Sequence, residues 1–372
     1  MSRLALATVS ALMFASAAQA AAPRPDARAF FVMNAATGEV LASHNAHKSV
    51  PIASITKLMT VLIALKHLKP SDVVTVTRYA AQVGESRIPL HHGQRIMVRD
   101  LLAGALIQSA NNAADALASA ASDGDIPLFV DWMNARARAL GLRDTHFVRP
   151  DGLDAPGHVS SARDVAVLAQ VAMHSPVVRD LVRRRTEGIE HGTFVVHTWN
   201  DLLGRFPGLI GVKTGHTNDA GWCEVAAARR SGYTIYAVNL GSPTRARRND
   251  DLNGLLAWGV SQYRTLRLVD AQTYAWAAAP FGLRAVALVA RKPLLRAVRV
   301  GRPIVEKIVA PTAVALPVLR GERLGRIEVW TGGKLLGTRP LLAGRSVSRP
   351  GVGGRLRWYA TRTVHNLVSL FP

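Results

Sequence analysis

The chain has 372 residues, with 46 Lys or Arg against 25 Asp or Glu and a formal charge of +21. Hydrophobic residues make up 49% of it, which excludes an intrinsically disordered chain. The single cysteine, Cys223, excludes an internal disulfide. The basic excess leaves nucleic acid, an anionic membrane surface or another polyanion as partners. From Arg267 onward there are 18 basic and four acidic residues, a net charge of +14, so a near-ordinary domain precedes a basic one.

The first 20 residues are typical of a secretory signal peptide. Arg3 gives a basic start, residues 4–15 are uncharged and mostly apolar, and Ala18-Gln19-Ala20 is a small-x-small cleavage site. A membrane-spanning helix needs about 20 apolar residues, and this stretch is shorter. A buried N-terminal helix is the alternative. Export makes nucleic acid an unavailable partner, so we expect none.

The apolar spacing that follows predicts an α+β domain. A strand at 29–33 and a second at 40–42 form a predicted hairpin. Apolar residues at helical spacing predict helices at 54–66, 99–121, 127–140, 162–173 and 251–262. Strand-like segments lie at 193–196, 221–228 and 234–240. This order predicts helices packed on an antiparallel sheet, in a domain covering residues 21–265.

The pattern changes near residue 266. Short β-branched or apolar segments alternate with Gly and Pro turns, which predicts a small all-β domain over residues 266–345. Residues 346–372 are a Gly/Ser/Pro linker and a stretch with apolar residues at helical spacing, beside Trp358, Tyr359 and several arginines. We expect an amphipathic helix on an anionic membrane surface. Docking of this helix on the β-rich domain is the alternative.

The first chemical motif is Ser54-Ile55-Thr56-Lys57. Residues three apart share a helix face, so the Lys57 amine can reach the Ser54 hydroxyl. A serine hydroxyl is a weak nucleophile and needs a neighbouring base. Lysine serves as that base only if burial or another cation lowers its pKa well below about 10.4. Taken alone, the motif is equally consistent with a helix cap followed by a surface lysine.

Two further motifs follow in a fixed order. Ser109-Ala110-Asn111 falls inside the predicted helix 99–121, and its polar residues would face each other only at a turn. Lys213-Thr214-Gly215 ends a strand-like stretch, and its glycine would let a substrate backbone approach the strand edge. Lys213 would also add a second cation near Lys57. S-x-x-K, S-x-N and K-T-G in this order indicate an acyl-transferring serine site, because this trio is shared by class A β-lactamases and penicillin-binding proteins.

With these motifs, the chain resembles the serine-type D-alanyl-D-alanine carboxypeptidases, which are low-molecular-mass penicillin-binding proteins. Further segments carry the likeness: residues 34–41, 51–60, 140–147, 150–154, 160–164 and 211–217. The resemblance is strong over about residues 29–260 and looser over 266–345. It implies a penicillin-binding and serine β-lactamase-like domain with a β-rich domain after it, and no cofactor or metal.

The resemblance also assigns roles to residues. Ser54 is the acylated nucleophile, Lys57 its general base, and Ser109 passes a proton to the leaving amine. Backbone N–H groups of Ser54 and His216 form the oxyanion hole. The residues implied in substrate binding are Asn111, Lys213, Thr214, Gly215, His216 and Arg248. Arg248 matches the position that holds the terminal carboxylate, with Arg245 and Arg247 as close alternatives in sequence.

The chain departs from the family pattern at a few positions. Ala110 and Asn112 replace a usual glycine and aspartate, and Trp199 stands where a polar residue is usual. These changes bear on substrate preference and deacylation more than on the reaction class.

The resemblance implies a periplasmic enzyme, peripheral on the inner membrane, that removes terminal D-alanine from peptidoglycan stem peptides and is acylated by β-lactams. The alternatives are a D,D-endopeptidase, a class A β-lactamase and a weakly catalytic penicillin-binding scaffold of the wall. No Glu-x-x-Leu-Asn lies between the second and third motifs, and the basic C-terminal part is unexpected in a β-lactamase.

Overall fold

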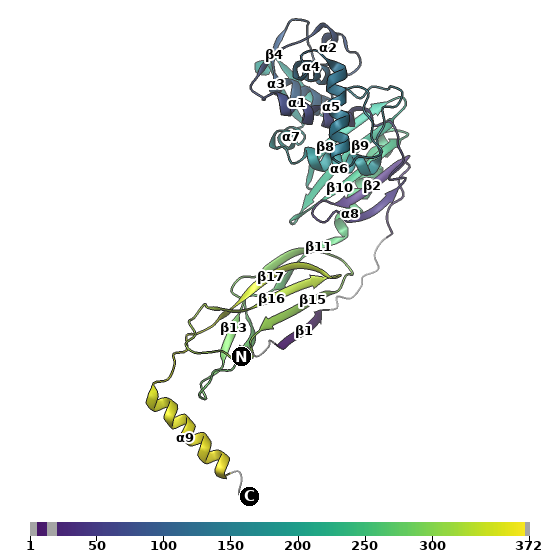
Figure 1. Cartoon of the computed structure of the whole chain (residues 1–372). Coiled ribbons are helices and arrows are strands. Elements are labelled where there is room, and N and C mark those ends of the chain that lie inside the picture. The colour runs from purple at the N-terminus through teal and green to yellow at the C-terminus, as the bar shows by residue number, and fades with distance from the viewer. Residues whose placement is uncertain (1–5, 13–20, 369–372) are drawn as a thin grey trace. The chain divides into compact units, whose positions relative to one another are not determined.

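The computed structural model describes residues 6–12 and 21–368. The chain divides into two compact units, one from Ala20 to Gln262 and one from Tyr263 onward, which also includes a strand near the N-terminus (Figure 1). The division lies close to the change of pattern near residue 266. The predicted α+β fold is confirmed, since the first unit packs helices on an antiparallel sheet and the second is rich in strands.

A five-stranded antiparallel sheet organises the first unit, in the order β3-β2-β10-β9-β8. Its strands are β2 (Ala29–Asn34), β3 (Val40–His44), β8 (Leu209–Thr217), β9 (Gly221–Arg230) and β10 (Tyr233–Ser242). The predicted hairpin is present, with Phe31 opposite Ser43. Strand β8 pairs with β9 and lies at the end of the sheet, so the K-T-G motif occupies an edge strand.

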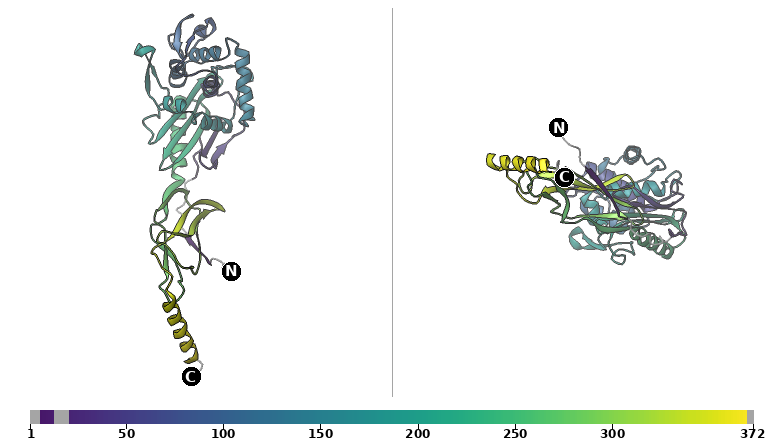
Figure 2. Two further views of the ribbon diagram at one scale, coloured as in Figure 1. Left: turned by 60° about the vertical axis from the view of Figure 1, so that its left-hand side comes forward. Right: turned by 90° about the horizontal axis from the view of Figure 1, so that it is seen from below.

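Alternating side chains of the sheet face two different helical layers. Tyr236, Val238 and Leu240 of β10 join the main apolar core, in which helices α1 (Lys57–His67) and α6 (Ala162–Ala172) are packed. The intervening residues point to the other face, where α8 (Arg245–Ser261) lies. A Cβ at Gly259 of α8 would come within 2.9 Å of the Ile235 side chain, so glycine lets this helix approach the sheet closely. The two helical layers are visible in the turned views (Figure 2).

The helical part of the core is built from short elements. They are η1 (Ala53–Thr56), α2 (Arg78–Gln82), α3 (Val98–Ala103), the π-helical turn η2 (Gly104–Gln108), α4 (Asn111–Ala121), α5 (Ile126–Ala139), α7 (Pro176–Leu181) and η3 (Glu190–Gly192). Two small hairpins accompany them: β4 (Val73–Thr75) with β5 (Arg95–Met97), and β6 (Thr186–Ile189) with β7 (Phe194–His197).

The continuous helix predicted over residues 99–121 is wrong. The helix widens into the π turn η2 and then stops, because Ser109 adopts the left-handed conformation with φ of 66°. Ala110 is extended, and α4 begins again at Asn111, whose N–H is donated to the Ser86 carbonyl oxygen at 2.7 Å. Apolar periodicity runs through both α3 and α4, so it did not show the break. Because of this break, Ser109 and Asn111 do not belong to one continuous helix.

The second unit contains a six-stranded antiparallel sheet in the order β1-β15-β16-β17-β13-β12 and a separate pair, β11 with β14. The strands are β1 (Leu6–Leu12), β11 (Tyr263–Val269), β12 (Thr273–Ala277), β13 (Val286–Val289), β14 (Leu294–Arg299), β15 (Ile304–Ala310), β16 (Arg323–Thr331) and β17 (Lys334–Ala343). Its own apolar core includes Leu288, Ile327 and Leu341, all fully buried. Under the signal-peptide prediction β1 belongs to the precursor alone, while the cleavage site at residues 18–20 lies outside the described residues.

Helix α9 (Val352–Val368) follows at the C-terminal end. Trp358 of α9 packs edge-on against Phe281, with ring centroids 5.6 Å apart, and Val352 and Leu356 are each 65% exposed. Among the described residues, no helix combines the length and the apolar character that crossing a membrane requires. Cys223 is buried in β9, and burial raises the pKa of its thiol to about 11.

Candidate active site

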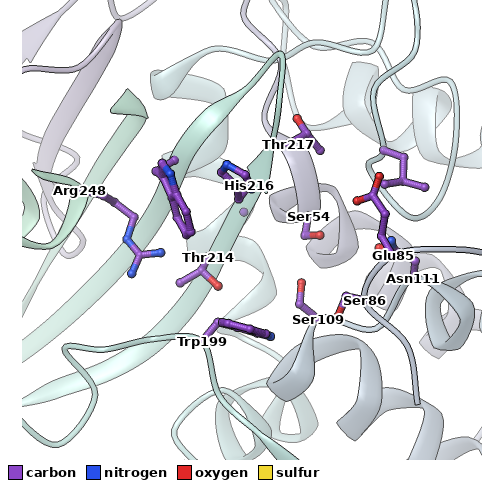
Figure 3. Close-up of a pocket in the computed structure, with 13 residues that line it drawn as sticks. Ser54, Glu85, Ser86, Ser109, Asn111, Trp199, Thr214, His216, Thr217 and Arg248 are labelled. Atoms are coloured by element: carbon purple, nitrogen blue, oxygen red, sulfur yellow. The ribbon is translucent and has the colours of Figure 1, made fainter. Parts of the chain in front are cut away.

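The three motifs meet in one pocket of about 230 Å³. Ser54 and Ser109 point toward one another across it, and Thr214 and His216 face them from strand β8 (Figure 3). The other lining residues are Glu85, Ser86, Asn111, Leu153, Trp199, Gly215, Thr217, Trp222 and Arg248. Residues 54, 109 and 213 are far apart in the chain, so the fold, and no local segment, creates this site.

Ser54 lies in the 3-10 turn η1 immediately before α1, and Lys57 is the first residue of α1. The Lys57 side chain is fully buried, and Nζ is 2.7 Å from Ser54 Oγ. Nζ also donates to Asn111 Oδ1 at 2.7 Å and to the Asp151 carbonyl oxygen at 2.6 Å. Two of its three directions therefore point at fixed acceptors, and the third points at the nucleophile.

Burial lowers the pKa of Lys57 to about 8, against the opposing pull of the Asp151 and Asp115 carboxyl groups. A neutral amine has two N–H donors and one lone pair. With Asn111 and Asp151 accepting the two donors, the lone pair points at the Ser54 hydroxyl. This arrangement suits proton removal from Ser54 by Lys57, because geometry and pKa both meet the demands on a general base.

Ser109 is 7% exposed, and Lys213 Nζ donates to its Oγ at 2.7 Å. Lys213 is 2% exposed, and burial, aided by the charge of Lys57, holds its pKa well below the ordinary value. Two buried lysines thus each hold one serine hydroxyl. Ser109 lies where a proton relay to a leaving group would need it, between a second amine and the pocket.

Asn111 uses both ends of its amide inside the protein. Its Oδ1 accepts from Lys57, and its Nδ2 donates to the Gly84 carbonyl oxygen at 3.1 Å. Asn112, which replaces the family's aspartate, makes two bonds with the backbone of Ile88. Both asparagines therefore fix the loop and Lys57, and binding of a substrate amide by Asn111 would require one of its bonds to be given up.

Gly215 brings strand β8 against the nucleophile turn. A Cβ at this position would lie 2.8 Å from the Ile52 carbonyl oxygen and 3.1 Å from the Ser54 nitrogen. Only glycine fits this approach. Next to it, His216 is exposed and its ring lies 4.0 Å from that of Trp222. Gly215, the residue before His216, therefore lies close to the backbone nitrogen of Ser54, as the predicted oxyanion hole requires.

Among the three candidate arginines near residue 248, Arg248 alone lines the pocket. It is 1% exposed and lies between two carboxylates, with Nη2 3.0 Å from Asp201 Oδ2 and Nε 3.1 Å from Glu224 Oε2. Arg245 instead forms a two-pronged pair with Asp201 and stacks over Trp199. The charge of Arg248 is thus already balanced before a substrate carboxylate arrives.

Several site residues escaped the sequence motifs. Glu224 and Asp201 have no motif of their own, and Trp222 follows the K-T-G segment at a distance that gives no signal. Trp199, a departure from the family pattern, donates its Nε1–H to the Gln108 carbonyl oxygen at 3.0 Å, and this bond ties the loop that carries Trp199 to the turn before Ser109. Gly152, within the family-like segment 150–154, has φ of 83° and lies against the Ala53 carbonyl, so this glycine is the sequence signal for the loop that presents Asp151.

Comparison with known proteins agrees with this geometry. A family model described as D-alanyl-D-alanine carboxypeptidase matches residues 16–244. The D-alanyl-D-alanine carboxypeptidase DacF of Bacillus subtilis is 31% identical over 343 residues, covering 88% of this chain and 87% of that protein.

Solved structures give the same result. Penicillin binding protein 6B of Escherichia coli is 28% identical, with a TM-score of 0.64, and the match covers 88% of this chain and 98% of that one. Penicillin-Binding Protein D2 of Listeria monocytogenes, solved in its ampicillin-bound form, is 31% identical with a TM-score of 0.58 over 63% of this chain and 98% of that one. The chain therefore belongs to the D-alanyl-D-alanine carboxypeptidase family, and it is a serine-type carboxypeptidase and hydrolase.

Proposed function

We propose that this enzyme removes the terminal D-alanine from peptidoglycan stem pentapeptides through an acyl-enzyme on Ser54. The observation that carries the proposal is the fully buried Lys57 amine, 2.7 Å from Ser54 Oγ, in a pocket bordered by an edge strand. With a pKa of about 8, roughly one tenth of Lys57 is neutral at pH 7, against about one in 3,000 for an ordinary lysine.

The chemical steps follow from the contacts. Neutral Lys57 takes the Ser54 proton, and Oγ attacks the carbonyl carbon between the last two D-alanines while backbone N–H groups stabilise the oxyanion. Ser109 donates its proton to the nitrogen of the leaving D-alanine as the C–N bond breaks, and the proton that Lys57 took from Ser54 replaces it on Ser109, so that Lys57 is neutral again. Water, deprotonated by Lys57, then attacks the ester, and Ser54 regains its proton. The edge of β8 offers unpaired backbone groups to an extended peptide.

Arg248 provides the charge for the substrate's terminal carboxylate. The carboxylate would enter a site in which Asp201 and Glu224 already contact the guanidinium. Binding therefore depends on weakening one of these contacts, which makes this subsite selective for ligands that place their carboxylate accurately.

The experiment that tests the reaction is incubation with a stem pentapeptide and measurement of free D-alanine. We expect release by the wild type and only background release by Ser54→Ala. Penicillin bound covalently without D-alanine release would refute carboxypeptidase activity and favour a weakly catalytic wall scaffold. Cleavage of a cross-linked peptide dimer in preference to the pentapeptide would favour an endopeptidase.

Inhibition by β-lactams is part of the proposal. A β-lactam ring presents an amide to the same nucleophile, and a relative with 31% identity has been solved with ampicillin bound. We expect a fluorescent penicillin to label the wild type covalently, and Ser54→Ala to stay unlabelled.

We further propose that the enzyme is exported and lies at the periplasmic face of the inner membrane, with α9 as a peripheral anchor. Exposed Leu356 and Val352 and the basic character of the second unit support this placement. Deleting residues 350–372 should move the protein from the membrane to the soluble fraction. The matched variants Leu356→Asp and Thr361→Asp add one charge each, and only the first should weaken binding to vesicles of phosphatidylglycerol. Unchanged retention after the deletion would refute the anchor.

A further inference from the structure

Asp115 is a buried carboxyl group that the proposed reaction does not use. It lies on α4, one turn after Asn111, with no exposed surface. Neither of its oxygens receives a hydrogen bond from any donor among the described residues. A buried ionised carboxylate without a donor is strongly unfavourable. Its protonation state therefore needs an explanation.

A second fully buried carboxyl group, that of Asp151, interacts electrostatically with Asp115. Arg149 pairs with both oxygens of Asp151 at 2.5 and 2.6 Å, and the Leu153 N–H is donated to it at 3.0 Å. Asp151 is thus well supplied with donors and remains ionised. A proton on Asp115 supplies the donor that is missing between the two groups, since a carboxylic acid donates to an adjacent carboxylate.

The electrostatic balance agrees with this reading. Burial, reinforced by the charge of Asp151, raises the pKa of Asp115 to about 8. Burial alone would raise the pKa of Asp151. The Arg149 guanidinium and Lys57 outweigh burial and hold this pKa below the usual value. Like charges side by side push two titrations apart in this manner, so one proton serves the pair.

This carboxyl pair is joined to the general base. The Asp151 backbone oxygen accepts from Lys57 Nζ at 2.6 Å, and Asn111, on the same helix as Asp115, accepts from the same amine. Both carboxyl groups act on Lys57, Asp151 through its charge and Asp115 once it ionises. The pair therefore influences Lys57 in three ways: through the Asp151 backbone oxygen, through the helix that Asp115 shares with Asn111, and through electrostatic interaction.

The remaining titratable and charged groups around the pair are Tyr79, Glu85, Arg149, His158 and, through Lys57, Lys213. Burial raises the pKa of Tyr79 to about 12 and lowers that of His158 to about 4, so both are neutral between pH 5 and 9. Arg149 is charged throughout and balances Asp151, while Glu85 is exposed to solvent. The groups whose charge varies next to Lys57 are Asp115 and Lys213.

We propose that Asp115 tunes the pH at which Lys57 becomes a free base: its carboxyl group keeps a proton near neutral pH and donates it to the Asp151 carboxylate, and once it loses that proton its negative charge favours charged Lys57. The inference rests on the proposed function of Ser54 and Lys57. Two arrangements of this site contain the same number of protons: neutral Lys57 with protonated Asp115, and charged Lys57 with ionised Asp115. Holding the proton on the carboxyl group leaves the Lys57 lone pair for Ser54.

The test is the pH profile of acylation by a fluorescent penicillin. In the wild type, ionisation of Asp115 adds a negative charge that favours charged Lys57. Acylation therefore reaches half its maximum at a higher pH than it would without that charge. Asp115→Asn is neutral at every pH and still has an N–H for Asp151. We expect its midpoint to move down by about one pH unit, the usual effect of one nearby charge.

The matched control is Asp100→Asn, another buried carboxylate, which is bonded to the Glu190 N–H at 3.1 Å and exerts no resolved effect on Lys57. Its midpoint should equal that of the wild type. An Asp115→Asn profile that is merely scaled at all pH values, or whose midpoint rises, overturns the proposal.

A second measurement does not depend on turnover. Infrared spectroscopy at pH 7.5 should show the carbonyl band of a protonated carboxyl group in a Glu224→Gln background, where Glu224 contributes none. That band should titrate near pH 8 and vanish in Asp115→Asn. Its absence overturns the proposal even if acylation is normal. Absence of penicillin labelling at every pH, with the band present, would instead refute the proposed function and leave the protonation of Asp115 supported.

Discussion

Replacing Lys57 by Met should abolish most acylation while leaving the fold nearly as stable as before. Lowering a pKa from 10.5 to about 8 means that the folded protein holds the charged form of Lys57 at a disadvantage of about 3 kcal/mol. Between pH 8 and 10.5 the folded state binds fewer protons than the unfolded chain, so this disadvantage is full below pH 8 and relieved as the pH rises.

Methionine has a similar length and no charge, so Lys57→Met removes that disadvantage at pH 7. It also leaves Asn111 Oδ1 and the Asp151 carbonyl oxygen without their donor, at a cost of about 1–3 kcal/mol each. The two effects nearly cancel, and we expect the free energy of unfolding to stay within about 2 kcal/mol of the wild type. Loss of a general base should slow acylation by about 10²- to 10⁴-fold.

The assay is paired: the second-order rate of labelling by fluorescent penicillin, and urea unfolding at pH 7. Lys66→Met, on the exposed side of the same helix, is the control and should change neither quantity. Labelling by Lys57→Met within tenfold of the wild type would refute the assignment of Lys57 as base. Destabilisation by more than about 4 kcal/mol would refute the account of its burial.

Three further predictions concern the pocket walls and the carboxyl group that contacts Arg248. Gly215→Ala places a methyl group 2.8 Å from the Ile52 carbonyl oxygen, and the displaced nucleophile turn should lower the labelling rate about 100-fold; a rate within threefold would contradict this. Burial raises the pKa of Glu224 from 4.5 to about 7, so the contribution of this group to stability is full below pH 4.5 and is lost as the pH rises through 7. At pH 8, Glu224→Gln should therefore unfold at a higher urea concentration than the wild type, with a free energy of unfolding larger by up to about 3 kcal/mol. At pH 4 the substitution should add no stability, and equal gains at both pH values would rule out the charge effect. Trp199→Ala, which removes a pocket wall and an anchor of the Ser109 turn, should raise KM for a pentapeptide more than Trp199→Phe does, and equal values for the two would exclude a wall role.

Sequence reasoning predicted the opening hairpin, the sheet with packed helices and the three motifs, because each depends on local spacing. It also required a turn at Ser109, yet it drew one helix through residues 99–121. Apolar spacing is nearly the same in an α-helix and across a π turn, so the left-handed residue that ends the helix left no trace in the pattern.

The charged surroundings of the site were beyond sequence reasoning for a different reason. Asp115 and Asp151 are 36 residues apart, and Arg248 meets Glu224 from another element. Such pairs become visible only when segments are packed together, and burial then decides which carboxyl group keeps a proton. The sequence therefore located the nucleophile and the base, while the structure identified the groups that surround them.

The most direct test of acyl transfer through Ser54 is intact-protein mass spectrometry after reaction with benzylpenicillin. The wild type should gain the mass of one penicilloyl group, and peptide mapping should place it on Ser54, while Ser54→Ala gains none. An adduct on another residue, or an equal adduct on Ser54→Ala, would contradict the account.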